Sequence, residues 1–486
     1  MKKFSSLLII FFILIVLPFT LQRCDFSKNE KTAKIEQLID YCYNNGIFNG
    51  TILVAEHGKV IYNKAKGFAN FETKERLNTD SPFYLASVTK QFTAMAIMML
   101  YEQGKLNYND QLTKYFPEFP DYAQKVTIRN MLNHTSGIAD HFELGLYKPG
   151  LTNKEVFDAL VQRKALDFEP NSRYSYSNGN YVLLSLIVEK ISGQPFSLFM
   201  KNHIFDPLNM DHTLVYDESK PEIPNRAIGY DMLGNVADYD ILTTGAGGIY
   251  STTEDLFKWD QALYTDQLVS QKTLEEAFTP ARLADGTSTG YGFGWGITET
   301  TTDKIISHGG GLGGFRTYIE RQPKHKNTII ILSNIGDATP ISDISREIRN
   351  ILNDQEMQYP KIPISLKIYN IIKESGIDMA IEKYGILRTN ELSRYDFSEE
   401  QLNQLGYYFL HRDMMDKAIA IFKLNVKEFP NSSNVFDSLG EAYLKIKNYE
   451  LASENYEKSL ALDPQNNNAV EMLNKIAREK VRPNEN

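Results

Sequence analysis

The chain has 486 residues, of which 42% are hydrophobic and 23% charged. This is enough for two or three folded domains and excludes a mostly disordered protein. Its 52 basic and 61 acidic residues give a net charge of −9. The basic residues are scattered, so a large nucleic-acid-binding surface is excluded. Only two cysteines are present, which excludes a disulfide framework and a cysteine-rich metal site. We expect no cofactor and no metal.

The N-terminus has the pattern of an export signal. Two lysines precede an apolar run over residues 4–21, and a basic start before a short apolar run is typical of such signals. Cys24 follows, but Arg23 stands where a lipoprotein signal has a small residue. Residues 1–24 are therefore expected to be an export signal, with lipidation or an uncleaved membrane anchor left open. The protein is expected to be exported, and either periplasmic or held at the membrane or cell surface.

The next part of the chain, residues 25–355, has strand patterns at both ends and helical patterns between them. A helix is predicted over residues 34–45, a β-hairpin over 50–63 and a helix over 87–103. Further strands are predicted over 291–297, 304–307, 315–321 and 328–333, followed by a helix over 341–352. This order predicts an α+β fold with one antiparallel sheet, flanking helices and an all-helical part.

A serine and a lysine three residues apart, Ser87 and Lys90, open the predicted helix at 87–103. Residues at this spacing share one helix face. A serine hydroxyl becomes a good nucleophile when a base takes its proton, and a lysine of lowered pKa can be that base. The helix N-terminus adds partial positive charge and an N–H group that fits one half of an oxyanion hole. Alone, the pair is more typical of an N-cap serine beside a solvated lysine.

Two later motifs supply the context for this pair. Tyr176 and Asn178 precede a predicted helix over 181–191, and from a loop both could point into a cleft. The phenol can relay protons and the amide can bind substrate. His308 and three following glycines fall between two predicted strands, where glycines allow close approach to the backbone. The N–H of Gly311 is a candidate for the second half of the oxyanion hole. His134 is expected only to hold its own loop.

These motifs, in this order, resemble those of the serine beta-lactamase and penicillin-binding-protein superfamily. The branch that they resemble contains class C beta-lactamases, D-alanyl-D-alanine peptidases and related esterases, and the resemblance spans residues 47–335. It implies that Ser87 is acylated and that Lys90 and Tyr176 share the proton transfers. It also implies substrate-binding roles for Asn178, His308, Gly310 and Gly311. Many members carry a lysine where His308 stands. Histidine is mostly neutral at pH 7, so we expect less dependence on a substrate carboxylate.

The C-terminal region changes in composition and contains an internal repeat. Prolines mark a boundary near residue 360, and residues 356–398 are expected to form a helical linker. Beyond it, several residues recur at an offset of 34 positions, among them Gly406 and Gly440, Ala418 and Ala452, and Phe422 and Tyr456. This period resembles the tetratricopeptide repeat. Residues 399–486 are therefore expected to form two repeats with a capping helix, which could bind a protein partner.

Two functions of different class follow from these patterns. The first is a serine hydrolase that forms an acyl-enzyme on Ser87 and cleaves an ester, an amide or a D-amino-acid peptide bond in a small-molecule or peptide substrate. Residues 139–166 and 216–240 are expected to line its pocket. The alternative is an inactive fold of the same kind that serves as a binding module, with protein interaction through the repeats.

Overall fold

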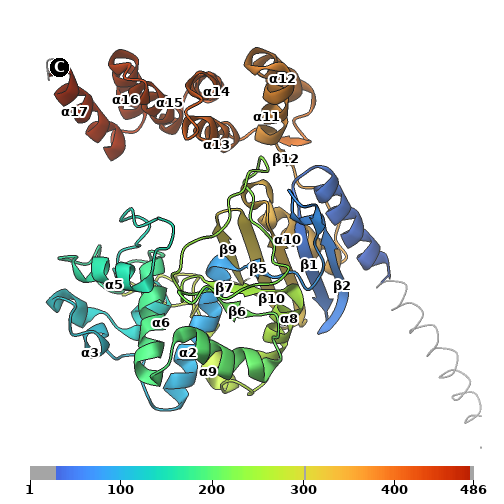
Figure 1. Ribbon diagram of the computed structural model, residues 1–486, viewed down its shortest axis with the longest axis vertical. Coiled ribbons are helices and arrows are strands. Elements are labelled where there is room, and N and C mark those ends of the chain that lie inside the picture. The colour runs from blue at the N-terminus through green and yellow to red at the C-terminus, as the bar shows by residue number, and fades with distance from the viewer. Residues whose placement is uncertain (1–28, 300–302, 482–486) are drawn as a thin grey trace, which may run out of the picture. The chain divides into compact units, whose positions relative to one another are not determined.

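The computed structural model describes residues 29–299 and 303–481 (Figure 1). It divides into two compact units, Met1–Pro360 and Lys361–Asn486. The predicted export segment, residues 1–24, lies outside the described residues. Within the described part, no single helix is both long and apolar enough to cross a membrane. One sharply bent pair, Asn178–Ser192 with Phe196–Leu208, passes the same test by length and composition.

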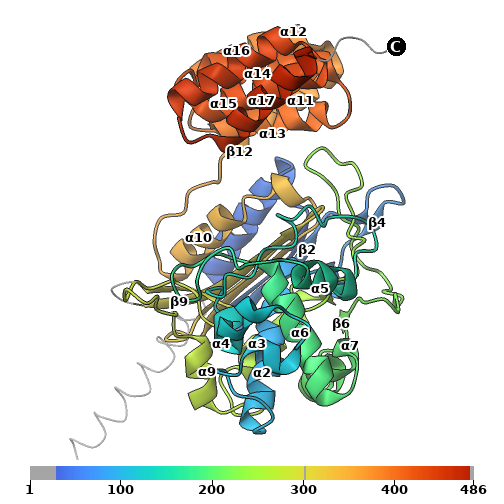
Figure 2. The ribbon, with the colours of Figure 1, turned by 90° about the vertical axis from the view of Figure 1, so that its left-hand side faces the viewer.

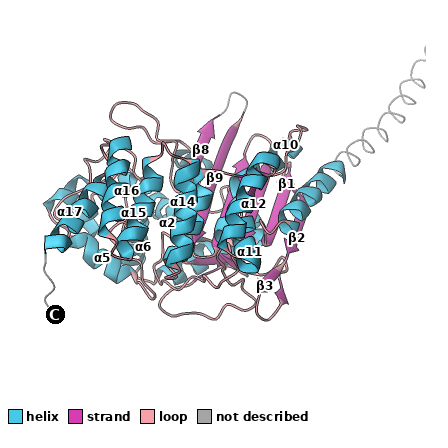
Figure 3. Ribbon diagram, turned by 90° about the horizontal axis from the view of Figure 1, so that it is seen from above, coloured by secondary structure: helices cyan, strands magenta, loops and turns pink. Residues whose placement is uncertain are grey.

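The first unit is built on a six-stranded antiparallel sheet with the order β2-β1-β11-β10-β9-β8, and its strands can be followed side by side in Figure 3. The N-terminal strand β1 pairs with the late strand β11, so both ends of the unit meet inside one sheet, as the sequence pattern predicts. Both strands carry a run of aliphatic residues and are almost fully buried, which suits central positions. The strand bounds are β1 Gly50–Glu56, β2 Lys59–Lys66, β8 Gly296–Glu299, β9 Lys304–Leu312, β10 Phe315–Gln322 and β11 Asn327–Ser333.

Helices cover both faces of this sheet, and two neighbouring residues of β10 show how. Successive strand residues point to opposite faces. Arg321 forms an ion pair with Asp260 of α8 (Thr253–Ala262), whereas Glu320 pairs with Arg349 of α10 (Ile341–Leu352). The helix over residues 29–44 packs beside α10, because Lys31 Nζ donates to the carbonyl of Leu352 at 2.7 Å. Figure 2 shows the two helices together on one side of the sheet.

The helical part of the unit surrounds two buried helices, α2 (Thr89–Glu102) and α6 (Asn178–Ser192). Nearly every residue of α2 is buried, which explains why its sequence is apolar on all sides. A small sheet of β5 (Phe83–Tyr84), β7 (Ile249–Ser251) and β6 (Leu214–Val215) fixes the chain as it enters α2. Shorter elements complete the part: α3 Leu112–Tyr115, α4 Ile128–Leu132, α5 Asn153–Val161, α7 Phe196–Met200 and α9 Gln271–Ala277, with the strand pair β3 Phe68–Asn70 and β4 Glu75–Arg76 nearby.

Two predictions about the late strands were wrong. The strand predicted over 291–297 begins only at Gly296, because Gly290 and Gly294 adopt positive φ angles of 68° and 76° and turn the chain. Buried aromatic residues in this turn imitate the alternation of a strand. The glycine motif that starts at His308 was expected between strands, but it lies inside β9. The motif is therefore held in the sheet ladder rather than in a loop.

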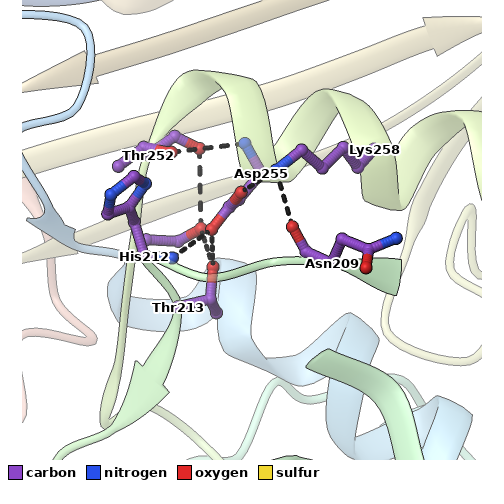
Figure 4. A network of polar contacts seen from close by, with 7 residues as sticks. Asn209, His212, Thr213, Thr252, Asp255 and Lys258 are labelled. Carbon is purple, nitrogen blue, oxygen red and sulfur yellow. Dashed lines mark hydrogen bonds and ion pairs between the residues drawn. The ribbon is translucent and has the colours of Figure 1, made fainter. Parts of the chain in front are cut away.

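A buried carboxylate ties the loop before β6 to the start of α8 (Figure 4). Asp255 is fully buried. Its Oδ2 accepts hydrogen bonds from the backbone N–H of His212 at 2.8 Å and from the Thr213 hydroxyl at 2.9 Å. Lys258 contacts Oδ1 at 2.8 Å and also donates to the carbonyl of Asn209. Asp255 therefore acts as an acid at the helix start that organises a loop.

The second unit consists of antiparallel helix pairs. Gly406 of α13 faces Phe422 of α14, and a Cβ at this glycine would lie 2.4 Å from the phenylalanine ring. Gly440 and Tyr456 repeat this contact 34 positions later, in α15 and α16, so the sequence repeat is a repeat of close helix packing. Two further helices, α11 and α12, precede these pairs and occupy most of the expected linker. The bounds are α11 Ile364–Ser375, α12 Ile377–Asn390, α13 Glu399–Leu410, α14 Met415–Glu428, α15 Ser433–Lys445, α16 Tyr449–Leu462 and α17 Asn467–Val481, with a parallel contact between β12 Ile362–Pro363 and β13 Tyr395–Asp396.

The Asp255 network predicts a large loss of stability when its acceptor is removed. Asp255→Ala leaves buried donors of the 209–213 loop unpaired, and we expect it to lower the free energy of unfolding by about 3 kcal/mol. Lys258→Met, which removes a one-third exposed partner, should cost about 1 kcal/mol or less. Both tryptophans of the chain, Trp259 and Trp295, lie in the first unit. Urea unfolding followed by tryptophan fluorescence therefore reports on this unit, and equal losses for both variants would contradict the assignment.

Candidate active site

Ser87 lies in a short 3-10 helix, Ala86–Val88, that leads into α2. The residue before it, Ala86, has a positive φ of 49°, a left-handed conformation that costs a non-glycine residue about 1–3 kcal/mol. Neighbouring hydrogen bonds hold this turn: Leu85 N–H donates to the carbonyl of Ile249 at 2.8 Å, and the Thr317 hydroxyl donates to the carbonyl of Leu85 at 2.7 Å. The nucleophile candidate thus sits on a strained turn anchored from two strands, a feature that the sequence pattern did not reveal.

Lys90 is completely buried and its amine is surrounded by acceptors. Nζ lies 2.8 Å from Asn178 Oδ1, 2.9 Å from the Ala246 carbonyl oxygen and 3.1 Å from Ser87 Oγ. The first two groups can only accept hydrogen bonds. Once the amine is neutral, two of its hydrogens satisfy these acceptors and its lone pair is left for the Ser87 hydroxyl.

Burial makes the neutral amine accessible near neutral pH. Burial lowers the pKa of Lys90 to about 7, although the nearby Asp140 carboxylate acts in the opposite direction. A lysine with an ordinary pKa would be almost fully protonated at pH 7 and could not accept a proton. The expected pairing of Ser87 with a lysine of lowered pKa is therefore present in the geometry.

Asn178 differs from its predicted setting. It is the first residue of α6 rather than part of a loop. Its Nδ2 donates to Asp140 Oδ2 at 2.7 Å, and its backbone N–H donates to the same oxygen at 2.9 Å. These contacts fix the amide so that Oδ1 faces Lys90. The sequence analysis did not identify Asp140 as a site residue. It predicted only that the segment 139–166, which contains Asp140, lines the pocket.

Tyr176 stands directly over the lysine, with Lys90 Nζ 4.9 Å from its ring centroid. Burial raises the pKa of the phenol above its ordinary value, although a hydrogen bond with Ser87 acts in the opposite direction. The side chain is therefore a neutral phenol at pH 7, which can pass a proton but is a poor resting base. Of the two predicted proton-transfer residues, Lys90 is the one whose pKa lies near neutrality.

The glycines of β9 form the opposite wall of the site. β8 pairs with β9 only as far as Ser307, so the edge of β9 beyond that residue is free to face the Ser87 turn. A Cβ on Gly310 would lie 2.2 Å from the Leu85 carbonyl oxygen and 3.1 Å from Ser87 N. Only glycine allows the strand to come this close. Gly311, the next residue, lines the same pocket as Ser87.

His308 is held by hydrogen bonds at both ring nitrogens. Nδ1 lies 2.6 Å from the carbonyl oxygen of Gly309, and Nε2 lies 2.8 Å from the Tyr291 hydroxyl. Since a carbonyl can only accept, Nδ1 carries the hydrogen and the tyrosine donates to Nε2. Burial, and next the charge of Lys90, lower the pKa of His308 to about 3. The ring is thus neutral, as expected for a histidine, and Tyr291 is a partner that the sequence did not indicate.

The pocket at Ser87 has a volume of about 230 Å³. His141 and Phe142 line it, as expected for the 139–166 segment, but no residue of 216–240 does. Ile241, Thr243 and Gly247 take that place. His134 was expected only to hold its own loop, but its ring accepts a hydrogen bond from Ser177 N–H at 3.1 Å and so holds the segment that carries Tyr176. No cluster of three or more possible metal ligands occurs among the described residues.

Comparison with known proteins places this geometry in a family. The family model "Beta-lactamase" matches residues 33–350, and the model "Tetratricopeptide repeat" matches residues 434–466. Penicillin-binding protein 4* of Bacillus subtilis is 37% identical over 380 residues, covering 73% of this chain and 82% of that protein.

Solved structures give the same result for the fold. The octameric penicillin-binding protein homologue from Pyrococcus abyssi aligns with a TM-score of 0.61 and 26% identity, covering 71% of this chain and 81% of that one. The D-amino acid amidase from Ochrobactrum anthropi aligns with a TM-score of 0.58 and 24% identity, covering 67% of this chain and 98% of that one. The resemblance inferred from the three motifs is thereby confirmed, and the chain belongs to the beta-lactamase family, with a tetratricopeptide repeat in its C-terminal region.

Proposed function

We propose that the protein is an active serine hydrolase that forms an acyl-enzyme on Ser87. The observation that carries this proposal is the completely buried Lys90 amine, 3.1 Å from Ser87 Oγ, with a pKa of about 7. A merely structural lysine would be expected at the surface or in an ion pair, because burying an ammonium group is costly. The alternative, an inactive binding module, gives no reason for this arrangement.

The proposed reaction begins with attack of Ser87 Oγ on the substrate carbonyl carbon while the hydroxyl proton passes to Lys90. The N–H groups of Ser87 and Gly311 stabilise the oxyanion. The intermediate collapses as the leaving group departs with the proton, which Lys90 returns through the Tyr176 phenol. A water molecule then attacks the acyl-enzyme and gives its proton to the same pair, which releases the acid and restores Ser87.

The substrate is proposed to be an ester, an amide or a D-amino-acid peptide without a required free carboxylate. His308 supports this choice, since both of its nitrogens are engaged and its imidazole is neutral. The substrate-binding roles of Asn178, His308, Gly310 and Gly311 remain predictions. Asn178 Oδ1 and Nδ2 already contact Lys90 and Asp140, so we propose that its first task is to position the lysine.

Export and partner binding also remain proposals. The basic and apolar N-terminus supports export to the periplasm or to the membrane surface. The repeats support binding of a protein partner. The predicted division at residues 25–355, 356–398 and 399–486 belongs to the same proposal, as does the absence of a cofactor.

Covalent labelling decides between the hydrolase and the binding module. A fluorophosphonate probe should label the wild-type chain with one equivalent and leave Ser87→Ala unlabelled, as detected by intact-mass spectrometry. Hydrolysis of p-nitrophenyl esters should fall by at least about a thousandfold in the same variant. Equal labelling of both chains, or a wild type that neither labels nor turns over any ester, amide or D-alanyl peptide, would refute the hydrolase.

The pKa of Lys90 predicts the pH dependence of acylation. The amine must be neutral to accept the Ser87 proton, and it becomes neutral as pH rises through about 7. We therefore expect kcat/KM to rise with pH, with a midpoint near 7 and a plateau above it. Asp140→Asn removes the charge that raises this pKa, so its midpoint should move to lower pH. A wild-type midpoint near 10, the value for an ordinary lysine, would contradict the lowered pKa of Lys90.

Two adjacent glycines offer a matched test of the β9 edge. In Gly310→Ala the new methyl group meets the Leu85 carbonyl at 2.2 Å, whereas in Gly309→Ala the nearest atom is 3.8 Å away. We expect the first change to push β9 away from Ser87 and to lower the acylation rate by about a hundredfold. The second should change it by no more than about twofold. Similar rates for both variants in stopped-flow acylation would show that the close approach is unimportant.

A further inference from the structure

A second cavity lies in the helical part of the first unit, apart from the Ser87 pocket. Its volume is about 640 Å³, larger than that of the Ser87 pocket and within the usual range for small-molecule sites of about 300–1,000 Å³. The two cavities share no lining residue. Its apolar lining residues are Phe116, Phe157, Phe196, Leu186 and Leu242, of which Phe157 and Leu186 are partly exposed and the others are buried. The cavity therefore offers an apolar surface for a small organic molecule.

The charged residues of this wall are mostly acidic. Four carboxylates line the cavity against two lysines, and neither lysine is committed to them. Lys154 pairs with Asp158 at 2.5 Å, and Lys190 donates to a backbone carbonyl and lies over the Phe116 ring. Within the described residues no ion pair is formed by the four acidic groups, so a negative surplus faces the cavity. They are Glu118, Glu189, Asp217 and Glu218.

Glu189 is one of these four acidic residues. It belongs to the buried helix α6 and is itself half-buried. Its Oε1 accepts the backbone N–H of Phe196 at 2.8 Å, and among the described residues Oε2 has no hydrogen-bonding partner. Burial, together with the charges of Asp217 and Glu218, raises the pKa of this carboxyl. A carboxylate that is desolvated and crowded by like charges gains most from a bound cation.

We propose that this cavity binds an organic amine with an apolar or aromatic body. The ammonium group sits beside Glu189 Oε2, where it supplies the missing positive charge. The body of the amine packs against the partly exposed Phe157 ring and Leu186, and an aromatic face also attracts cations. A carboxylate ligand would be repelled by the acidic groups, and an inorganic cation would leave the apolar part of the wall uncovered.

One segment connects the cavity to the catalytic lysine. Leu242 and Thr244 line the amine cavity, whereas Ile241 and Thr243, which alternate with them along the chain, line the Ser87 pocket. Two residues further on, the Ala246 carbonyl accepts the hydrogen bond from Lys90 at 2.9 Å. An amine that shifts this segment changes the acceptor geometry at Lys90. This coupling, unlike the binding itself, rests on the proposed function of Ser87 and Lys90.

Isothermal titration calorimetry of the full chain with 2-phenylethylamine tests the binding. The neutral analogue 2-phenylethanol and the anion 3-phenylpropanoate serve as ligand controls. We expect the amine to bind at least about tenfold more tightly than either control, and Glu189→Gln to weaken it by about tenfold. Glutamine still accepts the Phe196 N–H, so the thermal unfolding midpoint should stay within a few degrees. Glu75→Gln, an exposed acid on β4, should bind like the wild type.

The outcomes separate the cavity from the hydrolase proposal. No amine binding, or equal binding of amine and alcohol with no effect of Glu189→Gln, overturns the amine site. The coupling is tested by the rate of fluorophosphonate labelling at saturating amine, which should change by at least about twofold in the wild type and not in Glu189→Gln. An unchanged rate in the wild type overturns the coupling. A chain that does not label at all refutes the hydrolase, while the calorimetry still decides whether the cavity takes an amine.

Discussion

The arrangement of the first unit depends on the burial of one amine, that of Lys90. An ammonium group taken out of water is expensive unless it is paired or gives up its proton. Here three acceptors from separate parts of the chain surround it: Ser87, Asn178 at the start of α6, and the carbonyl of Ala246. The amine of Lys90 is fully hydrogen-bonded only when all three groups are in place. The site therefore forms only when the fold is complete.

The rest of the fold brings these parts together. The 3-10 turn at Ser87 is anchored to β7 through Leu85 and to β10 through Thr317. The edge of β9 approaches the same turn because Gly310 has no side chain. Helices on both faces hold the sheet through buried ion pairs of Arg321 and Glu320. A rigid sheet edge and a strained turn are suited to hold an oxyanion without rearrangement.

The repeats of the second unit follow a simpler rule. A glycine on one helix admits an aromatic ring from the next, as Gly406 does with Phe422 and Gly440 with Tyr456. Each contact is local, and its two partners are only 16 positions apart in the sequence. Short-range contacts of this kind leave a visible period in the sequence, which is why the repeat could be found there. The catalytic contacts leave no such period, since Lys90 and Ala246 are 156 residues apart.

The sequence by itself determined the fold class, the presence of strands at both ends of the first unit, and the three motifs that group Ser87, Lys90, Tyr176 and His308 as candidate site residues. These features are local patterns in the sequence, and the three motifs together are specific enough to indicate the family. Only the tertiary structure decided the burial that lowers the pKa of Lys90, the contact of Asp140 with Asn178 and the pairing of Tyr291 with His308. It also showed that the glycine motif lies within β9, and that residues from 241–247 rather than 216–240 line the pocket. Burial and the direction of a hydrogen bond depend on what packs around a residue, and that is decided by parts of the chain far from it in sequence.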